Sequence, residues 1–68
     1  MKQGSDRMLP PDVEAVELEE MLPLMTLDDL EEMLHEIYDR LRTEKDGQKL
    51  MRLLTNRDIV EKAIEKFY

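Results

Sequence analysis

The sequence predicts an all-α fold, a small bundle of three to four helices, on two observations. Leucine and isoleucine recur between positions 27 and 41 with alternating spacings of three and four residues, which is typical of an amphipathic helix. A second stretch with helical periodicity follows Thr55. The 68 residues suffice for one domain. We therefore expect a disordered N-terminal arm over 1–11 and one helical domain over 12–68, with its two long capped helices packed antiparallel and the domain dimeric.

The first predicted helix covers 12–22. Asp12 follows two prolines and is expected to cap this helix, because an Asp side chain accepts hydrogen bonds from the free N–H groups of a helix N-terminus. Leu18 falls outside the expected apolar stripe. Pro23 should end the helix, since proline disfavours the helical conformation of the residue before it. A short strand stays an alternative, because residues 17–19 alternate in polarity.

The second predicted helix, over 27–45, is the strongest element in the sequence. Thr26 precedes it, and Asp29 stands three residues after Thr26, which is a variant of the capping box. Asp46 and Gly47 are expected to end the helix, with Gly47 in the left-handed conformation that often follows a helix.

The C-terminal third is predicted to form two helices, a short one over 48–54 and a longer one over 56–67. The separation rests on Thr55, which begins a second capping pattern, Thr-Asn-Arg-Asp. The apolar residues of the longer helix should form one stripe, with its Glu and Lys residues facing water.

Several kinds of chemistry find no support in the composition. The chain has no Cys, so it offers no disulfide, no thiolate nucleophile and no Cys-based metal site. Glu32 and His35 have the spacing of a metal-binding pair, but a helical projection turns both away from the apolar stripe. Thr26 and Thr55 are assigned to helix caps, and one His cannot build much of a catalytic site. We expect no enzyme activity, no cofactor, no metal and no small-molecule substrate.

The net charge disfavours two further kinds of partner, nucleic acids and anionic membranes. Seventeen acidic and ten basic residues give a net charge of −7 and a pI near 4.6, which disfavours direct binding to nucleic acids or to anionic lipids. Apolar residues never occur in runs longer than two, so no segment should span a bilayer. The first residues lack the apolar stretch of a secretory signal, and we expect a cytoplasmic protein.

The predicted function is that of a small acidic adaptor or regulator, which docks its amphipathic helices onto another protein or onto a second copy of itself. A chain of this size hides only part of its apolar surface, and a homodimer or a protein partner would cover the rest. The expected apolar contact comprises Leu30, Met33, Leu34, Ile37, Tyr38 and Leu41. The acidic residues expected to steer towards a basic surface are Asp28, Glu32, Glu36 and Asp39.

Two alternatives stay open. The acidic helix could imitate DNA and inhibit a nucleic-acid-binding protein, because acidic side chains crowd one side of it. Residues 54–68, LTNRDIVEKAIEKFY, also resemble the second helix of ribbon–helix–helix repressors and antitoxins. That resemblance implies a DNA-binding regulator. However, the segment before Thr26 is acidic and interrupted by Pro23, where this family has a basic strand.

Overall fold

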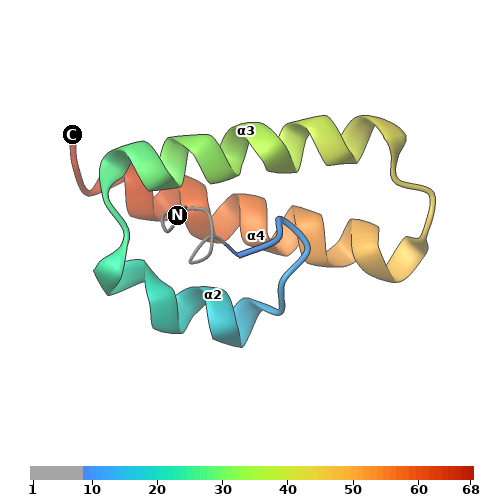
Figure 1. The fold of residues 1–68 in the computed structure, drawn as a ribbon, viewed down its shortest axis with the longest axis horizontal. Helices are drawn as coiled ribbons and strands as arrows, with labels where there is room; N and C mark the ends of the chain where they lie inside the picture. The colour runs from blue at the N-terminus through green and yellow to red at the C-terminus, as the bar shows by residue number, and fades with distance from the viewer. Residues whose placement is uncertain (1–8) are drawn as a thin grey trace, which may run out of the picture.

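The computed structural model describes residues 9–68, which form three α-helices and one short 3₁₀-helix, and no strand (Figure 1). The elements are α2 (Ala15–Met21), η1 (Leu22–Leu24), α3 (Leu27–Thr43) and α4 (Gly47–Glu65). The prediction of an all-α fold and a small helical bundle is confirmed. Most of the predicted N-terminal arm, residues 1–8, lies outside the described residues.

The start of α3 is fixed by the predicted capping box. The backbone N–H of Asp29 donates to Thr26 Oγ1, and the N–H of Thr26 donates to Asp29 Oδ2, both at 3.1 Å. Two of the free N–H groups at the helix start are thereby satisfied. The helix ends at Thr43 instead of residue 45, because the backbone of Glu44 is extended.

The prediction that Asp46 and Gly47 end a helix is wrong, because these residues begin one. Asp46 Oδ1 accepts a hydrogen bond from the N–H of Gln48 at 2.8 Å and so caps α4. Gly47 is the first residue of α4, and its φ is not positive. An Asp next to a Gly suits either helix end, and here the strong preference of Asp for the N-cap decides.

The predicted division of the C-terminal third is also wrong. One helix, α4, runs from Gly47 to Glu65, and Thr55 lies exposed within it. A side-chain cap forms only where N–H groups lack a helical partner, and in a continuous helix those after Thr55 bond to the preceding turn. Neither Gly nor Pro interrupts residues 48–65, so the helix continues through the capping pattern.

Helix α2 begins three residues later than predicted. Asp12 does not cap it; Asp12 lies in a turn in which the N–H of Val13 donates to the carbonyl of Pro10 at 3.1 Å. Glu14 occupies the N-cap position without a side-chain hydrogen bond. The α-helix ends at Met21, before Pro23, as predicted. The segment is helical, so the strand alternative does not hold.

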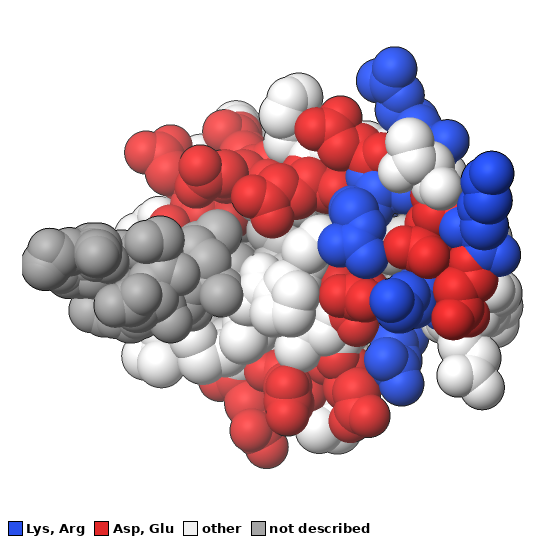
Figure 2. All heavy atoms as spheres, turned by 45° about the vertical axis from the view of Figure 1, so that its right-hand side comes forward, with Lys and Arg blue, Asp and Glu red and all other residues white. Residues whose placement is uncertain are grey.

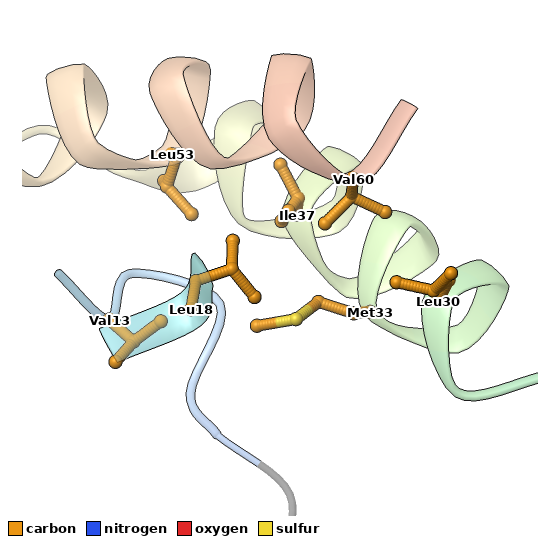
Figure 3. Packing of buried hydrophobic residues seen from close by; sticks show 7 residues of the cluster. All are labelled: Val13, Leu18, Leu30, Met33, Ile37, Leu53 and Val60. Carbon is orange, nitrogen blue, oxygen red and sulfur yellow. The ribbon is translucent and has the colours of Figure 1, made fainter. Parts of the chain in front are cut away.

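The core lies where the three helices meet, and Leu18 is central to it. The sequence placed Leu18 outside the stripe, yet its side chain is fully buried, whereas Val16 is 62% exposed. Figure 3 shows Met33 of α3 extending towards Leu18 of α2. The short helix α2 packs mainly on α4, and this contact selects the Leu18 side for burial. The buried apolar residues are Val13, Leu18, Leu30, Met33, Ile37, Leu53 and Val60.

Asn56 is the buried polar residue of this core. Its side-chain Nδ2 donates to the carbonyl of Pro11 at 3.0 Å and to the carbonyl of Val13 at 2.6 Å. These bonds attach the turn before α2 to the middle of α4. The Oδ1 atom of Asn56 is buried without a partner among residues 9–68. Both contacts of Nδ2 are to acceptors, so the amide orientation is determined by its surroundings.

The two threonines of the capping patterns provide a matched test of these helix boundaries. Thr26→Ala should lower the free energy of unfolding by about 1 kcal/mol, because it removes the cap of α3. Thr55→Ala should change it by less than about 0.5 kcal/mol, because Thr55 is an exposed residue within α4. Urea unfolding monitored by circular dichroism measures both values. Equal losses for the two variants would contradict a continuous α4.

The hydrogen bonds of Asn56 predict two further effects. Asn56→Ala should destabilise the protein by about 1–3 kcal/mol, because the buried carbonyls of Pro11 and Val13 lose their donor. Asn56→Asp should cost more, since a carboxylate of similar shape would face two carbonyl oxygens. Chemical denaturation gives both values. If Asn56→Asp unfolds at the wild-type urea concentration, the amide does not hold the turn.

Candidate protein-interaction surfaces

The apolar residues of the predicted site divide between the core and the surface of this chain. The fully buried ones are Leu30, Met33 and Ile37. Leu34 and Leu41 are half-buried and pack against the core. Tyr38 is 43% exposed. In this structure the stripe therefore holds α3 to the rest of the chain, and of these six residues Tyr38 offers the most surface to a partner. Its contact with a partner stays a prediction.

The acidic residues of the predicted site all lie at the surface. They are Asp28, Glu32, Glu36 and Asp39, and we call them the α3 acidic face. At about 100° per residue, Asp28, Glu32 and Asp39 project from the side of α3 opposite to Ile37, and Glu36 lies on the flank, about 100° from Ile37. Residues 12–39 contain eleven Asp and Glu residues and no Lys or Arg. In Figure 2 acidic side chains dominate the upper and lower parts of the surface, and basic side chains gather on the right.

Arg40, the first basic residue after this acidic stretch, is used within the fold. Its Nη2 donates to Glu44 Oε1 at 3.0 Å and lies 3.6 Å from Asp12 Oδ2. The hydrogen bond from Arg40 lowers the pKa of the Glu44 carboxyl, and the N–H of Asp46 adds to this. These contacts connect the turn before α2 to the last turn of α3.

Two tyrosine hydroxyl groups bridge α3 and the C-terminal part of the chain. Tyr38 Oη donates to Glu61 Oε2 at 2.6 Å, and Tyr68 Oη donates to Glu31 Oε2 at 3.2 Å. The hydrogen bond to Glu61 raises the pKa of Tyr38, and the one to Glu31 raises the pKa of Tyr68. In each pair the carboxylate favours the protonated phenol, so both bridges require neutral tyrosines.

A groove lies between α2 with η1 and the C-terminal half of α4, and sequence reasoning did not find it. Its two adjoining hollows share the residues Glu19, Leu22, Ala63 and Lys66. Asp58, Ile59 and Lys62 complete the first hollow, and Pro23, Met25, Leu30 and Phe67 the second. We call this surface the α2–α4 groove. Its walls come from segments about 40 residues apart, so no local pattern could indicate it. The one sequence signal is the pair of lysines one helical turn apart.

Residues 9–68 show neither a metal-binding cluster nor a membrane-spanning helix. Within residues 9–68, no three His, Asp or Glu side chains are grouped so that they could hold a metal ion. Glu32 and His35 are both exposed. None of the described helices is at once long and apolar enough to cross a membrane.

Comparison of this chain with protein-family models, with curated proteins and with solved structures finds no significant match.

The bridge between Tyr38 and Glu61 predicts a pH-dependent contribution to stability. The pKa of folded Tyr38 is raised, so the stabilisation is complete below the ordinary tyrosine pKa of about 10 and is lost as the pH rises through the folded value. Tyr38→Phe should therefore melt below the wild type at neutral pH, and the difference should disappear in strong alkali. Calorimetry across this pH range measures it. Tyr68→Phe is the matched variant for the second bridge. Identical melting of Tyr38→Phe and wild type at neutral pH would show that the bridge does not stabilise the protein.

Proposed function

We propose that this protein is a small acidic, non-catalytic protein-interaction module, an adaptor or regulator that binds a basic surface of another protein. The observation that carries this proposal is the unbroken acidic stretch over residues 12–39, part of which forms the exposed α3 acidic face. Arg40 and Arg52 contact Asp12 and Glu14 at the start of this stretch, but none of the ion pairs within residues 9–68 involves the α3 acidic face. A surface of one sign raises the rate at which an oppositely charged partner associates, and its effect weakens with salt.

The α3 helix is suited to present this charge to a partner. Leu30 and Ile37 are buried against the rest of the chain, and a capping box fixes the start of the helix. The acidic side chains therefore project from a helix that is anchored along its opposite side. Tyr38 borders this region with 43% of its surface exposed, and an aromatic ring adds apolar contact to an otherwise charged interface. Binding would require no rearrangement of the core.

The proposal includes three finer features that the sequence predicts. The first is antiparallel packing of the two long helices. Two hydrogen bonds favour it, because Tyr38 near the middle of α3 contacts Glu61, whereas Glu31 near the start of α3 contacts Tyr68, further along the chain. The second is a homodimer, which exposed apolar side chains such as Phe67 favour. The third is a cytoplasmic location, which suits a chain without cysteine.

A second candidate function is inhibition of a nucleic-acid-binding protein by imitation of DNA. The observation in its favour is again the acidic α3 face, whose carboxylates could occupy the basic surface that otherwise holds phosphates. This candidate differs from a general adaptor in one consequence, since its partner could not bind DNA at the same time. The antitoxin-like alternative stays a prediction. Residues 9–68 form no strand, whereas the ribbon–helix–helix family has a strand before its first helix, so no observation favours this alternative.

A pair of charge-reversal variants tests the proposed docking surface. Glu32→Lys with Glu36→Lys reverses two charges of the α3 acidic face, and Glu17→Lys with Glu20→Lys makes the same net change on α2. Partners should be captured from source cells by the wild type and the α2 variant, at low but not at high salt, and should be lost with the α3 variant. Quantitative mass spectrometry of the captured proteins measures this.

The captured partner then distinguishes the two candidate functions. Purified partner should bind the wild type and not the α3 variant in a titration. If excess DNA displaces the protein, the partner is a nucleic-acid-binding protein and the chain acts as a mimic. If DNA has no effect, the chain acts as an adaptor. Equal loss of binding in the α2 and α3 variants, or binding that salt leaves unchanged, would contradict docking through the α3 acidic face.

A further inference from the structure

The α2–α4 groove combines an apolar floor with two rims of opposite charge. Leu22 and Ala63 lie in both of its hollows, and Phe67, which is 53% exposed, lines one of them. Leu24, which lies in the sequence between the lining residues Pro23 and Met25, is 75% exposed. Exposed apolar residues that adjoin a hollow are typical of surfaces that bind another protein. The described part of this chain leaves them uncovered.

The charges of the two rims differ in sign. Glu19 belongs to the α2 side, and Lys62 and Lys66 belong to the α4 side. None of these three residues forms an ion pair within residues 9–68. Asp58 also lies on the α4 side, but Arg57 contacts it at 3.2 Å and balances its charge. The unbalanced groups are therefore one carboxylate on one rim and two ammonium groups on the other.

Such an arrangement is complementary to itself. In a dimer with two-fold symmetry, the same patch of both subunits meets, so each rim faces the opposite rim of the partner copy. Glu19 of one copy would then approach Lys66 of the other, and the reverse contact would form at the same time. An acidic peptide would match the lysines but repel Glu19, and a basic peptide would do the opposite. A second copy of the chain carries both charges in the required arrangement and satisfies both rims.

We propose that the α2–α4 groove is the homodimer interface of this protein, with its exposed apolar residues, such as Phe67, between the two copies and two Glu19–Lys66 ion pairs related by the symmetry axis. This inference rests on the homodimer that the proposed function includes, and it assigns the groove as the surface through which that homodimer forms. The α3 acidic face is made by a different helix. Its proposed role in binding a basic partner does not depend on the groove.

Complementary charge reversal in two separate chains tests this interface. Glu19→Lys places like charges opposite each other at both contacts of the dimer, and so does Lys66→Glu. Each variant alone should raise the dimer dissociation constant by about tenfold or more, because like charges across an interface are strongly unfavourable. An equimolar mixture of the two variants restores both ion pairs and should form heterodimers about as readily as the wild type forms homodimers. Sedimentation equilibrium and native mass spectrometry measure these populations.

The mixture also separates the interface from simple loss of stability. Lys66 lies at the end of α4, where a basic residue favours the helix dipole, so Lys66→Glu could weaken folding by itself. Mixing the two variants cannot restore folding stability that one chain has lost, whereas it does restore the ion pairs between two chains. Circular dichroism should show the same helix content for each variant. Glu36→Lys, on the α3 acidic face, is the matched control and should leave the dimer intact.

Three outcomes would overturn the proposal. The wild-type protein could stay monomeric at high concentration, or the mixture of the two variants could form no heterodimer. The third is that the Glu36→Lys dimer dissociates as readily as the Glu19→Lys dimer. The failure of the docking function gives a different result. In that case the dimer forms, and reversal of Glu32 and Glu36 changes no partner binding. A monomer that still binds a basic partner through α3 would leave the proposed function standing and remove only the interface.

Discussion

The side-chain amide of Asn56 joins parts of the chain that lie 45 residues apart, and the position of α2 depends on it. Helix α2 has only seven residues, has no side-chain cap, and makes few contacts with α3. Short isolated helices are marginal in water, so α2 needs tertiary support. Leu18 supplies it from one side, and the hydrogen bonds from Asn56 to Pro11 and Val13 fix the turn before the helix. In this position of α2 the buried amide nitrogen has two acceptors, so its burial is compensated by hydrogen bonds.

The placement of α2 has a consequence for the surface. It brings the acidic side of α2 opposite the C-terminal half of α4, where Lys62 and Lys66 stand one turn apart, and so creates the α2–α4 groove. The α3 acidic face does not depend on this docking, because one helix carries it. The protein therefore has two separate surfaces of different kinds. One is mixed in charge and apolar at its centre, and the other is charged with a single sign.

The sequence by itself determined the elements whose signals are local. Thr26 and Asp29 stand three residues apart, the spacing of a capping box at the start of a helix. The structure contains both of their reciprocal hydrogen bonds at the start of α3. The spacing of apolar residues over 27–41 determined that α3 is amphipathic, and with it the exposure of the acidic residues. Helical geometry relates these residues to one another whatever they pack against, so no tertiary information was needed.

Only the tertiary structure decided which of several locally allowed helix boundaries and buried faces the chain adopts. A capping pattern permits a helix to start but does not require it, and Thr55 stays within α4 because the preceding turn already accepts the N–H groups that it would cap. Leu18 is buried and Val16 exposed because α4 covers one side of α2. Asn56 and the groove could not be found from spacing, since their partners lie far away in the sequence. Burial is a property of contacts between elements, and a single chain segment does not contain that information.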